Sequence, residues 1–182
     1  IPFHLDRSVV IDRSPADVYA SVSDFATWRR WSPWLCQEPD CPVDLTGAPG
    51  TPGHGQAWSG DIIGSGNIQI SEAVQDVRLD YDLLFLTPWK SRSRVGFTFA
   101  PEGEGTRVTW WMQGSLPFFL FFIKKMTSAM VGGDYARGLG MLKEYLETGE
   151  VKSGVDVRTA AERGGFHYVG LRRSGRIADI GP

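Results

Sequence analysis

The feature that most constrains the fold is a succession of five strand-like segments joined by very short turns. In each segment apolar and polar residues alternate, and β-branched and aromatic residues are frequent, as in half-buried strands. The segments span residues 56–61, 67–74, 78–86, 91–100 and 107–114. The turns between them, such as Gly64-Ser65-Gly66 and Gln75-Asp76, are of hairpin length. The sequence therefore predicts an antiparallel meander.

The residues before the meander predict one more strand and two short helices. Residues 3–12 alternate in the same way and are expected to join the sheet, giving a total of about six strands. Ser14 followed by Pro15 signals a helix start, and Asp24 is expected to cap a second short helix over residues 24–31. Residues 37–55 are rich in Pro and Gly without a sustained period, so we expect a long irregular loop there.

A long helix is predicted after Pro117, ending near Thr148. Its apolar residues fall on one stripe, which is expected to cover the inward face of the sheet: Ile123, Met126, Met130, Val131, Tyr135, Leu139, Leu142 and Leu146. Four glycines at positions 132, 133, 138 and 140 each weaken a helix by about 1 kcal/mol relative to Ala. A kink, close packing against the sheet, or room left for a guest molecule would each explain them.

Alternation along the strands assigns the two faces of the sheet. Leu79, Tyr81 and Phe97 belong to the inward set, whereas Asp80 and its outward neighbours predict a solvated face. The inward residues, the short helices and the long helix converge on one chamber, which is typical of a pocket for an apolar molecule. The predicted lining is Trp31, Trp34, Trp58, Tyr81, Phe97, Trp110, Met112, Met130, Tyr135 and Leu139. Each of these residues taken alone is better explained as core, whereas their convergence as a group favours a pocket.

Polar contacts in this chamber are expected from few residues. The candidates are Glu72, Gln113, Asp134 and the hydroxyl of Tyr135. His4, His54 and His167 lie in separate segments with no spacing that suggests a pair. The sequence has no HExxH motif, no GxSxG motif and no phosphate-binding glycine loop. We therefore predict no catalytic residue, no metal and no cofactor.

Composition excludes further classes of function. The net charge of −2 provides no broad positive field, so no nucleic-acid partner is expected. The longest apolar run, residues 116–123, is far shorter than the ~20 residues of a membrane span. Cys36 and Cys41 are compatible with either a local disulfide or two free thiols.

Five segments, in this order, resemble those of a known family. They are RSVVID at 7–12, DFATWRRWSPW at 24–34, AWSGD at 57–61, PEGEGTRVTW at 101–110 and MVGGDYARGLGMLKEYLE at 130–147. Together they are similar to the polyketide cyclase/dehydrase and lipid-transfer group of the START-like helix-grip superfamily, also called SRPBCC proteins. The resemblance implies an α+β helix-grip fold, in which a curved antiparallel sheet wraps around a long C-terminal helix.

The resemblance also implies a function. Most members bind or transport small hydrophobic molecules, so we expect a lipid-like or aromatic ligand between the sheet and the long helix. One alternative is a cyclase- or dehydratase-type enzyme acting on a polyketide-like or aromatic substrate. Another is a regulatory module that senses a small molecule. The sequence does not indicate an oligomeric state.

The predicted domain covers residues 1–148 and is followed by a linker over 149–154. Residues 155–182, which include GGFHYVGLRRSGRIADIGP, resemble the opening strand of a GyrI-like effector-binding domain and are otherwise explained as a tail. The opening PFHLDRS is similar to members that carry a membrane anchor just upstream, so an anchor before Ile1 is an expectation. Both a cytoplasmic and a membrane-anchored location are compatible with this.

Overall fold

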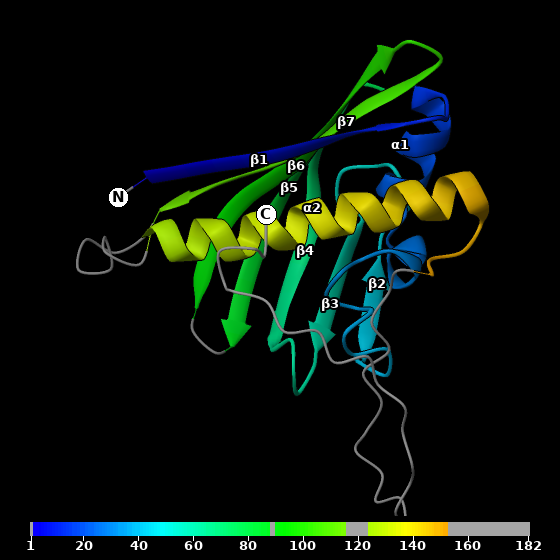
Figure 1. Cartoon of the computed structure of the whole chain (residues 1–182). Helices are drawn as coiled ribbons and strands as arrows, with labels where there is room; N and C mark the ends of the chain where they lie inside the picture. The colour runs from blue at the N-terminus through cyan, green and yellow to red at the C-terminus, as the bar shows by residue number, and fades with distance from the viewer. Residues whose placement is uncertain (1, 88–89, 116–123, 153–182) are drawn as a thin grey trace, which may run out of the picture.

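The computed structural model describes residues 2–87, 90–115 and 124–152 (Figure 1). One antiparallel sheet, two short helices and one long helix make up this part of the chain. In chain order the elements are β1 (Pro2–Ile11), α1 (Pro15–Ser23), the 3-10 helix η1 (Phe25–Arg30), β2 (Val43–Thr46), β3 (Gly55–Ser59), β4 (Ser65–Val74), β5 (Arg78–Thr87), β6 (Ser91–Glu102), β7 (Gly105–Ser115) and α2 (Lys124–Thr148).

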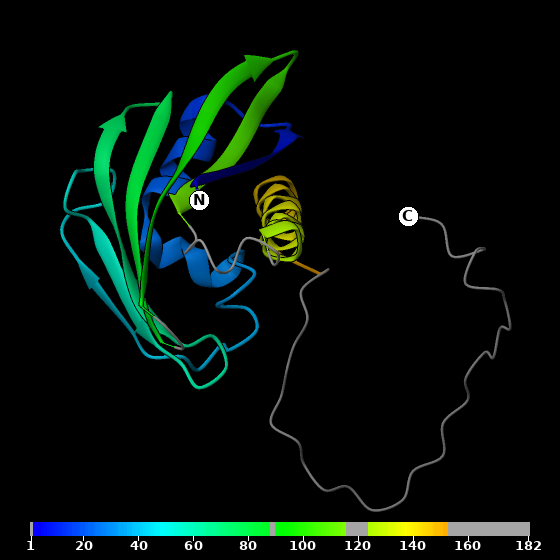
Figure 2. The same cartoon turned by 90° about the vertical axis from the view of Figure 1, so that its left-hand side faces the viewer.

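The sheet has seven strands in the order β1-β7-β6-β5-β4-β3-β2, and all neighbours are antiparallel. The six predicted strands are confirmed to within two residues at each end. The sheet is curled and α2 lies at its open side (Figure 2), while α1 and η1 lie near one end of the sheet (Figure 1). The α+β helix-grip fold expected from the sequence is confirmed.

The seventh strand, β2, lies inside the segment predicted to be an irregular loop, and for residues 43–46 that prediction was wrong. This edge strand has four residues, of which three are exposed, and it pairs only with β3. Its residues VDLT alternate apolar and polar, but a pattern of four residues within a segment rich in Pro and Gly is too short to set a strand apart from a loop. The pairing with β3, which the local sequence does not reveal, completes the strand.

The helix signals in the sequence are confirmed. The Ser14 side chain accepts a hydrogen bond from the Asp17 backbone N–H, and Pro15 is the first residue of α1. Asp24 caps η1 through the backbone N–H of Ala26. Unbroken over 25 residues, α2 shows no break at the Gly132-Gly133 pair.

Close packing accounts for one glycine of α2. A Cβ atom at Gly138 would lie 2.8 Å from Cζ3 of Trp110 and 2.9 Å from Cδ of Pro33. The helix therefore approaches the sheet more closely here than any other residue would allow. Of the predicted stripe, Tyr135, Leu139 and Leu142 are buried, whereas the side chains of Ile123, Met126 and Met130 lie outside the described residues.

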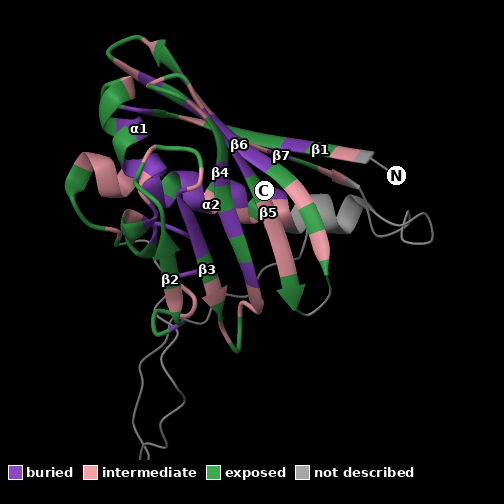
Figure 3. Ribbon diagram, turned by 180° about the vertical axis from the view of Figure 1, so that it is seen from behind, coloured by how far each residue is buried: buried purple, intermediate pink, exposed green. Residues whose placement is uncertain are grey.

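The outer face of the sheet is largely polar and exposed, as predicted, and burial alternates along its strands (Figure 3). Asp80 is the exception, since it is only 5% exposed. Arg78 Nε and Arg94 Nη2 approach its carboxylate to 3.6 and 3.7 Å. Here the expectation of a solvated residue was wrong, because two long side chains from neighbouring positions cover the carboxylate.

Three further expectations concern the ends and the cysteines. Cys36 and Cys41 are free thiols. The GyrI-like segment at 155–182 and most of the linker at 149–154 lie outside the described residues. Among the helices that the structure describes, none is long and apolar enough to cross a membrane.

Candidate functional site

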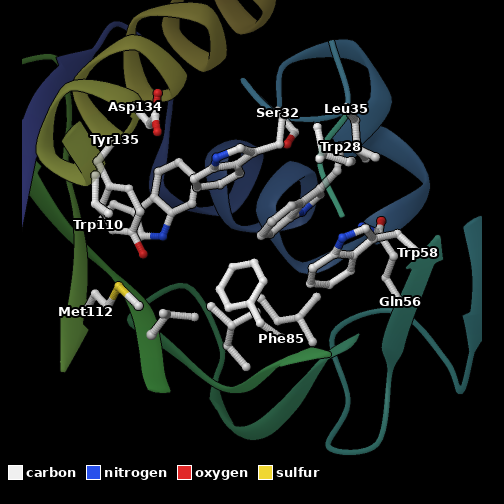
Figure 4. Close-up of a pocket in the computed structure, with 16 residues that line it drawn as sticks. Trp28, Ser32, Leu35, Gln56, Trp58, Phe85, Trp110, Met112, Asp134 and Tyr135 are labelled. Atoms are coloured by element: carbon white, nitrogen blue, oxygen red, sulfur yellow. The ribbon is translucent and has the colours of Figure 1, made fainter. Parts of the chain in front are cut away.

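A cavity of about 150 Å³ lies between the inner face of the sheet, the segment after η1, and α2 (Figure 4). Aromatic and aliphatic side chains form most of its walls. It is set beside a packed aromatic core, which fills the rest of the space between the sheet and the helices.

Five of the ten residues predicted to line the chamber line this cavity. They are Trp34 after η1, Trp58 on β3, Trp110 and Met112 on β7, and Tyr135 on α2. The Trp110 ring stacks on that of Tyr135 with centroids 4.2 Å apart, and Trp34 meets Trp110 edge-on at 5.6 Å. These three rings form one wall. Contact of these residues with a ligand stays a prediction.

Four other predicted residues do not line the cavity. Trp31, Tyr81, Phe97 and Leu139 are at most 1% exposed and belong to the packed core. They face inward as predicted, but neighbouring rings fill the space in front of them, as where Phe97 stacks on Trp110 at 4.7 Å. The tenth residue, Met130, has a side chain outside the described residues.

Several lining residues were missed by sequence analysis. Trp28, Ser32 and Leu35 come from η1 and the turn after it, whose orientation the sequence does not specify. The strands add Gln56, Ile68, Leu83, Phe85 and Val95. Alternation alone could have found Leu83, Phe85 and Val95, because they share the inward parity of Tyr81 and Phe97. Gln56 gives no such signal, since a polar residue is not expected on an inward face.

Two lining residues each hold a polar atom that has no hydrogen-bond partner among the described residues: the indole Nε1 of Trp110 and the carboxamide Oε1 of Gln56. Both residues are buried. The two atoms are themselves almost completely buried, so other parts of these side chains form the cavity wall.

Hydrogen bonds to the backbone hold Trp28, which lines the cavity, and Tyr81 in the core behind it. Trp28 Nε1 and the Tyr81 hydroxyl both donate to the carbonyl of Val22, at 3.0 and 3.1 Å. Burial raises the pKa of Tyr81, which keeps this hydroxyl a donor. His54 is also structural: its Nε2 accepts from the Phe25 backbone N–H, so Nδ1 carries the proton and donates to the Thr46 carbonyl at 2.9 Å.

Asp134 is the one acidic residue among those that line the cavity (Figure 4). Desolvation by burial raises its pKa, while the charge of Arg137 and a hydrogen bond from the Trp34 side chain offset part of the shift. Burial also raises the pKa of the neighbouring Tyr135. Of the other expected polar contacts, Glu72 pairs with Arg78 and Gln113 is exposed, both on the outer face.

One edge of the cavity is held in place by an acidic side chain. The carboxylate of Glu38 accepts hydrogen bonds from three consecutive backbone N–H groups, those of Asp61, Ile62 and Ile63, at 2.7 to 3.0 Å. These hydrogen bonds lower the pKa of Glu38. Because Ile63 lines the cavity, Glu38 fixes the β3–β4 turn beside it.

No group of three or more His, Cys, Asp or Glu residues suited to a metal ion occurs in the part of the chain that the structure describes. What the site offers is an apolar cavity with one carboxyl group, that of Asp134, in its lining. This arrangement can bind a small molecule by shape and orient it by a few polar contacts.

A curled sheet that grips a long helix defines the helix-grip class of proteins, and here an apolar cavity lies between the two. The chain belongs to the family described as polyketide cyclase / dehydrase and lipid transport, whose sequence model matches residues 2–147. No protein with a curated description matches the chain.

Solved structures are similar in fold. Protein MLL2253 from Mesorhizobium loti superposes with a TM-score of 0.62 at 16% identity, over 80% of this chain and 97% of that one. A protein from Thermobifida fusca gives 0.61 at 24% identity, over 79% and 92%. DynU16, a protein in the dynemicin biosynthetic locus, gives 0.62 at 20% identity, over 85% of this chain and 51% of DynU16. At these identities the similarity is one of fold.

Proposed function

We propose that this protein binds a small hydrophobic molecule in the cavity between the sheet and α2. The observation that carries the proposal is an apolar cavity of about 150 Å³ next to a core that is otherwise filled by aromatic rings. Protein interiors are close-packed, and an engineered apolar cavity of similar volume in another protein binds benzene or xenon. Family membership supports the same conclusion.

The proposed contacts are the aromatic residues that line the cavity, foremost Trp34, Trp58, Trp110 and Tyr135. Their flat faces supply large contact area at little cost in side-chain entropy. Trp31, Tyr81, Phe97 and Leu139 would support this wall from behind, because they fill the core next to it.

Native mass spectrometry of the protein purified from cells, together with displacement of a fluorescent apolar probe, tests the proposal. We expect a co-purifying small molecule, or saturable binding of the probe. In the variant Val131→Phe a larger side chain would occupy the cavity, and probe affinity should fall at least tenfold. The matched variant Val77→Phe, at an exposed turn, should bind as the wild type does. Equal affinity in all three proteins would contradict the proposal.

A second candidate function, an enzyme of the cyclase or dehydratase type, is supported by Asp134. A carboxyl group with a raised pKa beside a cavity is suited to general acid or base catalysis. If this function is correct, Asp134→Asn abolishes turnover of an aromatic polyketide-like substrate and leaves binding of the apolar probe intact. A pure binding protein shows no turnover in either form.

A further inference from the structure

A second hollow lies where β4 joins β5, at the opposite end of these strands from the cavity. It is an open groove of about 640 Å³ between α1, the loop at 49–52 and the β4–β5 turn. Small apolar residues form much of its sides, among them Ala16 and Ala20 on α1 and Pro49 and Pro52 in the loop. None of the residues that line the groove lines the cavity, so the two are separate.

Backbone hydrogen bonds hold the loop at 49–52 against its neighbours. The Gly50 N–H donates to the carbonyl of Ser23, the last residue of α1, at 3.0 Å. Just after the loop, the Gly53 N–H donates to the carbonyl of Ile70 on β4 at 2.9 Å. The loop is thus tied both to α1 and to the sheet. A ligand in the groove would therefore need to order little of the protein.

Tyr19 supplies a hydroxyl group that is open to the groove. Its side chain lines the groove and is only 8% exposed, and its ring meets that of Phe99 edge-on at 5.7 Å. The hydroxyl forms no hydrogen bond with the residues that the structure describes, yet it is not among their enclosed, unpaired atoms. The hydroxyl of Tyr81, by contrast, donates to a backbone carbonyl in the core. A ligand in the groove can therefore pair the Tyr19 hydroxyl.

Asp76 places a carboxylate near this hydroxyl. Its φ angle of 59° in the β4–β5 turn is a left-handed conformation that Asp tolerates better than most residues. Burial raises the pKa of Tyr19, and the negative charge of Asp76 adds to the shift. Within the described part of the chain the Asp76 side chain takes part in no hydrogen bond or ion pair. This carboxylate is therefore free to bind a cation.

The charge of the groove is entirely negative. Its lining includes Asp76 and Asp24 and contains no Lys, Arg or His. The imidazole of His54 lies 3.9 Å from the Asp24 carboxylate, but its Nε2 accepts a hydrogen bond from a backbone N–H and so carries no proton. Arg78, which follows the turn, pairs with carboxylates on the outer face of the sheet. No described side chain thus supplies a cation to the groove.

We infer that this groove binds a small organic ammonium ion with a short aliphatic chain. The ammonium group donates to the carboxylate of Asp76 and to the hydroxyl of Tyr19. A hydrogen bond between an ammonium and a carboxylate is about twice as strong as one between neutral groups, so the cation is selected over a neutral alcohol. The chain lies against the alanine and proline side chains. This site is independent of the ligand proposed for the cavity.

Three probes with equal numbers of non-hydrogen atoms test the role of charge: n-pentylammonium, 1-pentanol and butanoate. Each is titrated into the full chain at neutral pH and followed by ¹H–¹⁵N NMR. The backbone amides of Gly50, Thr51 and Asp76 report the groove, and that of Ile63 reports the cavity. We expect n-pentylammonium to shift the groove amides saturably. The alcohol and the anion should bind there at least about tenfold more weakly.

Variants assign the binding to residues. Asp76→Asn removes the charge, and Asn also tolerates the left-handed conformation, so the affinity for n-pentylammonium should fall about tenfold. Tyr19→Phe removes the hydroxyl and keeps the ring, and the affinity should fall about threefold. Asp44→Asn, the same substitution at an exposed position of β2 outside the groove, should leave it unchanged. Circular dichroism and thermal unfolding confirm that each variant is folded.

Several results would overturn the inference. One is the absence of a saturable shift of the groove amides with n-pentylammonium, and another is equal affinity of the groove for 1-pentanol. A loss in Asp44→Asn as large as that in Asp76→Asn would show attraction to surface charge in general. Tighter binding of Nα-acetyl-lysine methylamide than of n-pentylammonium would assign the groove to a lysine of a partner polypeptide and contradict a small-molecule site.

Discussion

The interior of this protein has two parts that are built from the same kinds of residue but differ in how completely those residues fill them. In the filled part, Trp31 and Phe97 are fully buried, and neighbouring rings occupy the space around them. In the other part, Trp34, Trp58 and Met112 border a cavity of about 150 Å³. The comparison teaches that aromatic residues alone do not distinguish a cavity from a core, because the difference lies in the space left between them.

The largest expected difference between the two parts is in stability. Trp31→Ala removes a ring that is fully buried and contacts Trp28 and Phe97, so the free energy of unfolding should fall by about 3–5 kcal/mol. Trp58→Ala removes a partly exposed ring beside the cavity, and its cost should be smaller, about 1–2 kcal/mol. Urea unfolding of both variants measures the difference. Equal losses would mean that the cavity region is packed as tightly as the core.

Enlarging a valine should give the next largest difference. Val108 is fully buried in the core, so Val108→Phe should destabilise the protein by about 1–3 kcal/mol through overpacking. At the cavity wall, Val131→Phe places the same extra atoms in free space, and the free energy of unfolding should change by less than about 1 kcal/mol. The same unfolding assay applies. If the free energy of unfolding fell more for the change at position 131 than for the change at position 108, the presence of free space beside Val131 would be contradicted.

These two comparisons also show what the sequence could predict. Alternation identified the strands and the inward face, so that Trp110 and Met112 were found from parity alone. Whether two inward side chains meet depends on the curvature of the sheet and on the seating of η1 and α2, which local patterns do not encode. For this reason the sequence could not show that Trp31 and Phe97 fill the core whereas Trp34 and Trp58 line the cavity. It also gave no reason to include Gln56. The edge strand β2 was missed because its apolar-polar alternation is only four residues long and lies within a segment rich in Pro and Gly.

Titration of Asp134 should give a smaller effect with a defined sign. Folding raises the pKa of this carboxyl above its ordinary value of 3.8, so its ionised form destabilises the fold at neutral pH and its protonated form does not. Asp134→Asn should therefore raise the free energy of unfolding at neutral pH, by less than about 1 kcal/mol because the group is partly solvated. Below the ordinary pKa the gain should vanish. A loss of stability at neutral pH would show that Asp134 supports the fold and does not strain it.

The smallest expected effect concerns Glu38 beside the cavity. Hydrogen bonds to backbone N–H groups lower its pKa below the ordinary value of 4.5, so its stabilising effect is present above that value and is lost as the pH falls through the lowered pKa. The wild type should therefore lose stability more steeply on acidification than Glu38→Gln does. Thermal unfolding between neutral and strongly acidic pH measures the two slopes. Identical slopes would mean that Glu38 does not hold the β3–β4 turn.

The most direct test of the account is a crystal structure of the protein under xenon pressure. Xenon enters apolar cavities without needing polar contacts, so it reports empty space and not specificity. We expect xenon density between Trp34, Trp58 and Met112, and none within the core around Trp31. A well-ordered crystal with no xenon between the sheet and α2 would contradict the central claim that this part of the interior is unfilled.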